Sequence, residues 1–130
     1  MLFRSPFTSY TDNKLIDHLL GSGTYTKPAS KYVALFVGDP QGAGAEVSTS
    51  GTAYARQSGA FTISGGNATN TSAIEYPAAT ASWGTINYVA IYDASTSGNM
   101  LVSAALTSAK TIGSGDVLRI PTSQLSVTLT

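Results

Sequence analysis

The side chains that most often carry catalysis are few in this chain, and they form no familiar motif. There is one histidine, His18, and there is no cysteine. A thiol–imidazole pair and a thiolate metal site are therefore both excluded. No serine stands in the Gly-x-Ser-x-Gly pattern of a nucleophile elbow. We expect His18 to be an ordinary residue on a helix surface or at an interface.

The acidic residues offer a second route to chemistry, because two carboxylates that flank one bond can hydrolyse a glycoside. The seven acids are scattered along the sequence, and two of them, Asp39 and Asp116, stand beside Gly or Pro in expected turns. Asp commonly bends and caps the backbone in such turns. A catalytic pair would require a strand residue such as Glu75 to meet an acid from a loop. We therefore expect no enzymatic activity and no catalytic residues.

Two short stretches resemble ion-binding or phosphate-binding loops, but neither pattern is complete. Asp93, Ser95 and Ser97 alternate like calcium ligands, yet a tight calcium loop uses several carboxylates and a final Glu. Residues 113–116 lack the Lys and the following helix of a phosphate loop. The sequence thus predicts no metal ion and no cofactor.

Tyrosine and tryptophan suggest a binding chemistry, because aromatic rings stack on sugars and the Tyr hydroxyl adds a polar handle. Tyr54, Tyr76 and Tyr88 are the candidate glycan-facing residues. The alternative, which we favour, is that such rings fill the core with their polar ends at its edge. Trp83 follows a run of small residues over 77–82. This pattern predicts an extended segment with the indole as a plug.

Charge is low and balanced, with seven basic and seven acidic side chains and 11% charged residues. Nucleic-acid binding needs clustered Lys and Arg, so we expect no nucleic-acid partner. The longest apolar stretch, residues 32–38, is far shorter than a membrane span, and the N-terminus lacks the apolar run of a signal peptide. We expect no membrane association. A weakly charged surface suits subunits that pack against neighbours, although an ordinary Thr-rich β protein fits the composition equally well.

One helix is expected in an N-terminal arm that occupies residues 1–22. Its apolar stripe, at helical spacing, consists of Leu15, Ile16, Leu19 and Leu20. Ser9 with Asp12 resembles a capping box, and Gly21 stands where a left-handed C-terminal residue is wanted. One helix cannot bury such a stripe alone, so it must dock on the sheet or on another subunit. The candidate contact residues for such a neighbour are Phe3, Phe7, Tyr10, Leu15 and Leu19. The alternative is that this segment covers one end of its own domain.

Residues 31–130 are expected to form strands. Residues 31–37 and 85–92 are apolar on both faces, which predicts two central strands, with Ile86, Tyr88 and Ala90 on one face of the second. Further strands are expected at 53–57, 60–64, 72–76, 100–106, 117–120 and 125–130, with a polar connection over 65–71. Roughly seven or eight antiparallel strands predict a single all-β domain over residues 1–130, a β-sandwich with one short N-terminal helix. The expected core residues are Tyr32, Leu35, Trp83, Ile91 and Val127.

The run from Tyr76 to Thr85, which contains Pro-Ala-Ala-Thr-Ala-Ser-Trp-Gly, is similar to a family of small tailed-phage virion proteins. The resemblance continues in residues 13–18, 32–35, 39–40, 53–56, 91–94, 98–101, 105–110 and 115–116, so it spans nearly the whole chain. Members of this family are often labelled tail-fibre proteins, and similar β-sandwich proteins serve as trimeric capsid cement. The family pattern holds no catalytic residues.

The resemblance implies a virion protein, for which two roles remain open. The first is a capsid cement or decoration protein that binds the major capsid protein on the outer surface of the shell as a homotrimer. Such a protein reinforces the assembled lattice by mass action on the bound state. The second is a tail-fibre or tailspike-associated module that recognises a host surface polysaccharide. Both roles require a rigid β scaffold, so the sequence leaves them as alternatives.

Overall fold

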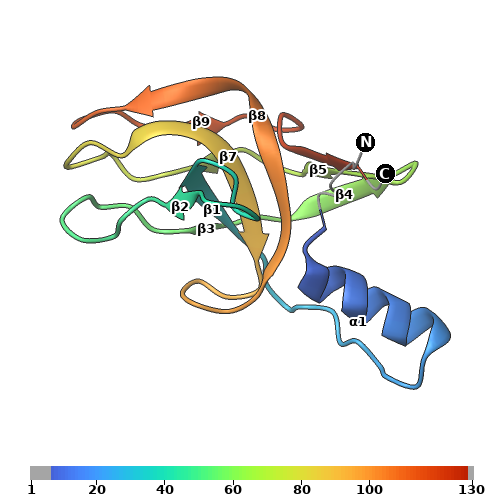
Figure 1. Cartoon of the computed structure of the whole chain (residues 1–130). Helices are drawn as coiled ribbons and strands as arrows, with labels where there is room; N and C mark the ends of the chain where they lie inside the picture. The colour runs from blue at the N-terminus through green and yellow to red at the C-terminus, as the bar shows by residue number, and fades with distance from the viewer. Residues whose placement is uncertain (1–6, 129–130) are drawn as a thin grey trace.

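Two long strands form the centre of the largest sheet in the computed structural model, which describes residues 7–128 (Figure 1). This sheet contains β1 (Tyr32–Val37), β2 (Ala45–Glu46), β3 (Gln57–Ser58), β7 (Gly84–Tyr92) and β8 (Met100–Ile112). Its order is β2-β1-β7-β8, and β3 pairs with β1 beside β2. The prediction that residues 31–37 and 85–92 form central strands is confirmed, because β1 and β7 pair with each other and each has a second partner on its other edge.

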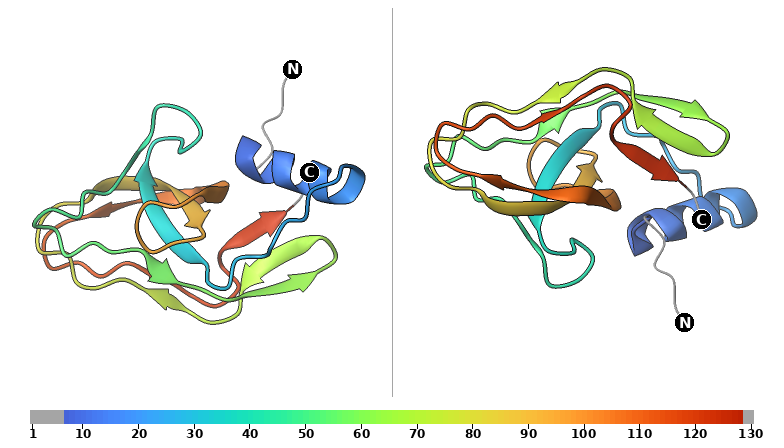
Figure 2. Two further views of the ribbon diagram at one scale, coloured as in Figure 1. Left: turned by 90° about the horizontal axis from the view of Figure 1, so that it is seen from below. Right: turned by 90° about the horizontal axis from the view of Figure 1, so that it is seen from above.

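Two smaller sheets lie against this one and complete the sandwich (Figure 2). They consist of β4 (Phe61–Ser64), β5 (Asn67–Asn70) and β10 (Ser126–Thr128), and of β6 (Ile74–Glu75) with β9 (Arg119–Ile120). The strand pairs are antiparallel, and one helix, α1 (Ser9–Leu20), precedes them. The prediction of an all-β, sandwich-like fold with one short helix is confirmed. The described part holds ten strands, several of only two residues, where roughly seven or eight were predicted.

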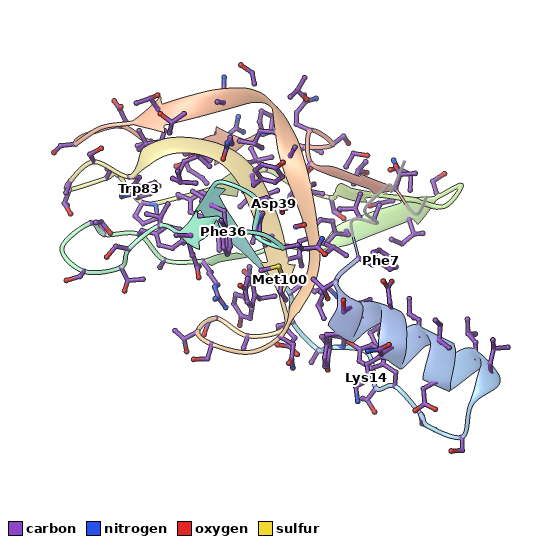
Figure 3. The ribbon with its side chains drawn as sticks, in the orientation of Figure 1. Phe7, Lys14, Phe36, Asp39, Trp83 and Met100 are labelled. Atoms are coloured by element: carbon purple, nitrogen blue, oxygen red, sulfur yellow. The ribbon has the colours of Figure 1, made fainter. Side chains whose placement is uncertain are left out.

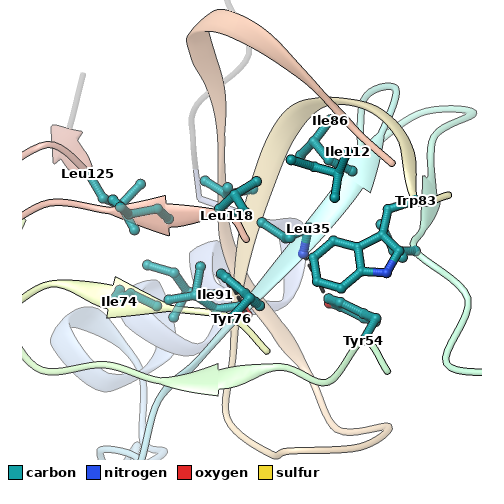
Figure 4. Packing of buried hydrophobic residues seen from close by; sticks show 14 of the residues in the cluster. Leu35, Tyr54, Ile74, Tyr76, Trp83, Ile86, Ile91, Ile112, Leu118 and Leu125 are labelled. Atoms are coloured by element: carbon teal, nitrogen blue, oxygen red, sulfur yellow. Dashed lines mark hydrogen bonds between the residues drawn. The ribbon is translucent and has the colours of Figure 1, made fainter. Parts of the chain in front are cut away.

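The main core lies between the layers (Figure 4). The structure places Leu35, Trp83, Ile91 and Val127 in it, all less than a tenth exposed. Tyr32 was also expected there, and that prediction is wrong. Side chains alternate along a strand, so Tyr32 lies on the opposite face of β1 and is only half-buried.

A β-bulge between β7 and β8 reverses the expected face of Ile86. Tyr88 pairs with Ala105 but Ile86 pairs with Lys110, so residues 106–109 of β8 stand opposite Asn87 alone. Ile86 therefore joins the main core, whereas Tyr88 packs against a smaller cluster on the outer face of the sheet. A shift of one residue moves a side chain to the other face of a sheet. β8 bends sharply at the bulge, as Figure 1 shows.

Two further segments differ from the sequence prediction. Residues 53–56 are not a strand: Ala53 has a left-handed backbone with φ of 61°, and pairing begins at Gln57. Residues 65–71, predicted as a polar connection, contain β5. Gly65 and Gly66 have φ of 59° and 78°, which suits a two-residue hairpin turn between β4 and β5. Pairing with two neighbouring strands stabilises β5 in spite of its polar composition.

Three aromatic rings close one end of the core (Figure 4). Tyr54 and Tyr76 stack with ring centroids 6.2 Å apart, and Trp83 lies edge-on to both at 5.5 and 6.2 Å. The Trp83 indole N–H donates to the Thr52 carbonyl oxygen at 2.8 Å. The indole is thus both packed and hydrogen-bonded, as the plug hypothesis requires.

Replacing Trp83 with Ala should lower the free energy of unfolding by about 3–5 kcal/mol, because it leaves a cavity beside the stacked rings of Tyr54 and Tyr76. Urea unfolding followed by circular dichroism measures this change. The control is Val117→Ala, at a side chain 51% exposed, which should change stability by no more than about 0.5 kcal/mol. Equal effects of the two substitutions would contradict the role assigned to the indole.

Candidate interaction surface

Threonine hydroxyls attach the start of α1 to the first residues of β8. The Thr8 hydroxyl oxygen accepts a hydrogen bond from the Thr11 N–H at 3.3 Å, so Thr8, and not the predicted Ser9, is the N-cap. The Thr8 hydroxyl donates to the Met100 carbonyl at 2.6 Å, and the Thr11 hydroxyl donates to the Leu101 carbonyl at 2.8 Å. These bonds fix the direction in which the helix leaves the sheet. Figure 3 shows α1 extending away from the strands, with Lys14 on the helix and Met100 at the start of β8.

The loop that follows α1 covers one side of the helix. Tyr25 lies edge-on to Tyr10 with ring centroids 6.5 Å apart, and its backbone N–H donates to His18 Nδ1 at 3.2 Å. The Asp17 carboxylate accepts the Gly23 N–H at 3.2 Å. His18 therefore acts as a hydrogen-bond acceptor on the helix surface. Gly21, expected to be left-handed, has an extended backbone with φ of −100°.

The apolar stripe of α1 lies on the side that this loop does not cover. Ile16, Leu19 and Leu20 are 60%, 74% and 85% exposed, and no residue of α1 is buried. They are three of the six large hydrophobic side chains that are exposed within residues 7–128. Soluble monomers rarely expose contiguous apolar patches unless these bind a partner. The stripe is therefore the candidate interaction surface.

The five candidate contact residues lie in different environments. Phe3 falls outside the described residues. Phe7 is half-buried against the core and lines an apolar groove of about 200 Å³. Tyr10 contacts Tyr25, and Leu15 is half-buried. Of the five, Leu19 is the described residue that is freely exposed as part of the stripe. The hypothesis that the segment covers its own domain thus fits Phe7 but not the stripe.

The glycan-facing hypothesis is wrong for Tyr54 and Tyr76. Both are core residues, 3% and 2% exposed, so a sugar cannot stack on either ring. Their hydroxyls are occupied inside the protein, where Tyr76 donates to the Val33 carbonyl at 2.7 Å and Tyr54 donates to Glu46 at 2.7 Å. Tyr88 is half-buried on the outer face of β7. These three residues therefore form no exposed aromatic strip.

A partly buried ion pair, which the sequence analysis did not identify, holds the loop over residues 93–99. Arg56 Nε and Nη2 each lie 2.9 Å from one carboxylate oxygen of Glu46. Arg56 Nη1 donates to the carbonyls of Ala94 and Ser97 at 3.0 and 2.8 Å. The guanidinium also stacks 3.6 Å from the centre of the Tyr92 ring. No spacing rule pairs an Arg with a Glu ten residues before it in an irregular segment, so the sequence carried no signal for this contact.

The ion pair and the hydrogen bonds around it shift the pKa values of Glu46 and Tyr54. Burial raises the pKa of the Glu46 carboxyl, but hydrogen bonds from Arg56 and Tyr54 outweigh it, and the pKa lies below its usual value. Burial and the hydrogen bond to Glu46 both raise the pKa of the Tyr54 hydroxyl. The network therefore consists of an ionised carboxylate, a guanidinium and a protonated phenol at neutral pH.

The stretch that resembled a calcium loop is closed on itself. The Asp93 carboxylate accepts hydrogen bonds from the Asn99 backbone N–H at 2.7 Å and from its side-chain amide at 3.0 Å. Within residues 7–128, no three His, Asp or Glu side chains gather where they could hold a metal ion. Over the same residues, no helix has the length and apolar character needed to span a membrane.

Glu46→Gln should destabilise the protein near pH 7 by about 3 kcal/mol, because it leaves the buried Arg56 charge without a counter-charge. A carboxyl whose pKa is lower in the folded state stabilises the fold above its unfolded pKa of about 4.3. That contribution is lost as pH falls through the pKa of Glu46 in the folded state. The difference in free energy of unfolding between wild type and variant should therefore narrow towards pH 3. Chemical denaturation at both pH values measures it.

The exposed pair of Arg119 and Glu75 provides a matched control. Its nitrogen and oxygen lie 3.7 Å apart, with the two side chains 56% and 63% exposed. Glu75→Gln should therefore change stability by less than about 1 kcal/mol at either pH. A wild-type to Glu46→Gln difference that stays constant between the two pH values would contradict an ionised Glu46.

Comparison with known proteins places the whole fold in one family. No curated protein matches the chain. A family model does match, over residues 6–128, and it is described as the podophage GP4 fiber I protein gp80. The match covers both the helix and the strands of the sandwich, and it confirms the resemblance to small tailed-phage virion proteins. The chain therefore belongs to the Gp80 family and is a structural protein of a tailed-phage virion.

Proposed function

We propose that this chain is a non-enzymatic, homotrimeric component of a virion fibre that binds its protein neighbours through the apolar stripe of α1. The observation that carries the proposal is the exposure of Ile16, Leu19 and Leu20 on a helix with no buried residue. The family description supports the fibre role. A homotrimer is the state that the resemblance to trimeric β-sandwich virion proteins implies, and closed symmetry satisfies the same surface in every copy.

Capsid cement is the second candidate function, and the weakly charged surface favours it. With 11% charged residues, the chain can desolvate broad areas against a neighbour without burying many charges. In this role the trimer would bind the major capsid protein on the outer surface of the shell and stabilise the assembled lattice. Direct recognition of a host polysaccharide is not proposed, because Tyr54 and Tyr76 are buried.

The number of copies per virion distinguishes the two roles. Gel densitometry of purified particles, normalised to the major capsid protein, should give a small fraction of the capsid-protein amount for a fibre component. An amount comparable to that of the major capsid protein would reject the fibre role and establish the cement role. Labelling of purified particles with an antibody to this chain would distinguish the same two roles, because the label would lie on a fibre in one case and over the whole shell in the other.

Light scattering on the purified protein should report three chains, and replacement of both Leu19 and Leu20 with Ser should give one. Both side chains are mostly exposed in the single chain, so circular dichroism should show that the variant still folds. Ile63→Ser is the matched control, since Ile63 is 69% exposed on β4, outside the stripe, and this variant should remain trimeric. A monomeric wild type at every concentration would reject the homotrimer.

A further inference from the structure

The loop that joins β7 to β8 lies at the same end of the sheet as the first turn of α1 (Figure 1). Where this loop returns to the sheet, the register of β7 and β8 shifts between Ile91 and Tyr92, and Leu101 of β8 has no partner on β7. Leu101 is thus the extra residue of a second β-bulge. A bulge interrupts the regular ladder of a strand, so the backbone carbonyls at this point can serve another element.

The carbonyls of this second bulge are the acceptors that hold α1. The Leu101 carbonyl accepts the Thr8 N–H at 3.1 Å and the Thr11 hydroxyl at 2.8 Å. The Met100 carbonyl accepts the Thr8 hydroxyl at 2.6 Å. The helix packs against β8, and none of its own residues is buried. Because so little apolar contact restrains the helix, the positions of these two carbonyls decide the direction in which it leaves the sheet.

Arg56 holds the other side of the same loop. Its guanidinium stacks on Tyr92, 3.6 Å from the centre of the ring. It also donates to the carbonyls of Ala94 and Ser97 at 3.0 and 2.8 Å. The Arg56 side chain is 8% exposed, and the Glu46 carboxylate accepts hydrogen bonds from its Nε and Nη2 at 2.9 Å. A planar guanidinium can bond a carboxylate and two carbonyls at once in a fixed geometry, whereas a Lys ammonium has no such fork.

Hydrogen bonds inside the loop connect the part that Arg56 holds to the bulge. The Asp93 N–H donates to the Asn99 carbonyl at 3.2 Å, and the Asp93 carboxylate accepts the Asn99 N–H at 2.7 Å. Gly98 has a left-handed φ of 77°, and a Cβ there would lie 2.6 Å from the Asp93 carboxylate. Burial, Tyr10 and Asp93 together raise the pKa of the Tyr25 hydroxyl, so Asp93 also faces the loop that covers α1. A loop closed this tightly moves as one unit with the start of β8.

We infer that Arg56, held by Glu46, sets the direction of α1 through the β7–β8 loop. Arg56 is a positioning residue: it holds the loop, the loop holds the bulge, and the bulge carbonyls hold Thr8 and Thr11. Chains of hydrogen-bonded and packed groups carry such coupling between distant sites. Loss of the guanidinium would let the loop shift and would turn the apolar stripe to a new direction. All of these contacts lie within one chain, so the coupling does not depend on the assembly or the partner proposed above.

A distance measurement between two spin labels by double electron–electron resonance tests the coupling. Leu19→Cys and Thr111→Cys place the labels at exposed positions, one near the end of α1 and one on the far half of β8. The chain has no cysteine of its own. Dilution with an excess of unlabelled wild-type chains restricts the measured distances to those within one chain. The labelled protein should give one narrow distance distribution, and Arg56→Met should broaden it and shift its centre.

Two control variants separate the coupling from a general loss of stability. Thr11→Val removes a hydrogen bond between α1 and the bulge directly, so it should also broaden and shift the distribution. Ile120→Ala leaves a cavity in the core at β9, far from the loop, and should leave the distribution unchanged. Circular dichroism verifies that each variant is folded. Arg56→Lys, which keeps the charge but lacks the planar fork, replaces Arg56→Met if that variant does not fold.

The outcomes decide the role of Arg56 whatever the oligomeric state. Changed distributions in the Arg56 variant and in Thr11→Val, with none in Ile120→Ala, support the coupling. An unchanged distribution in a folded Arg56 variant would overturn it, because α1 would then keep its direction without the guanidinium. The same change in Ile120→Ala would also overturn it, because the direction of α1 would then follow overall stability. A monomer in light scattering would reject the proposed homotrimer and leave the coupling standing.

Discussion

The structure depends on how the backbone of β1 is hydrogen-bonded inside the core. Two separate short strands, β2 and β3, cover one edge of β1, and the N–H of Leu35 faces the gap between them. An unpaired buried N–H would be strongly destabilising. The Tyr54 hydroxyl accepts this N–H at 3.0 Å, and the Tyr76 hydroxyl donates to the neighbouring Val33 carbonyl at 2.7 Å. Two phenols thus complete a sheet edge that no single strand covers.

The hydrogen bond between the Leu35 N–H and the Tyr54 hydroxyl also determines how Glu46 and Arg56 are bonded. Because the Tyr54 hydroxyl accepts from Leu35, its proton is free to go to Glu46, which must be ionised to accept both this proton and the Arg56 guanidinium. Arg56 in turn fixes the loop over residues 93–99 through two carbonyls. Tyr54 and Tyr76, two of the three candidate sugar-binding residues, are therefore parts of the scaffold, and their hydroxyls face inward.

These particulars show what a single sequence can predict here. The strands β1 and β7 were predictable because a strand buried on both faces is apolar at successive positions, and α1 was predictable from its stripe. The partners of Tyr54 and Tyr76 were not, since they are backbone atoms 19 and 43 residues away. Nor was the bulge, because residues 106–109 carry no Gly or Pro that marks a break in the ladder. The stripe of α1 could be predicted from its spacing, but only the fold shows that Leu15 is half-buried while Leu19 and Leu20 stay exposed.

The way in which α1 is attached to the sheet explains why its apolar stripe stays exposed. A helix of 12 residues is marginal on its own, and most helices in domains gain stability by burying an apolar face. This helix is held instead by the Thr8 and Thr11 hydroxyls at one end and by the loop on its polar side. That arrangement leaves the stripe free while it fixes the direction of the helix relative to β8. Short hydrogen bonds at the first turn thus hold the helix in place of an apolar face buried against its own chain.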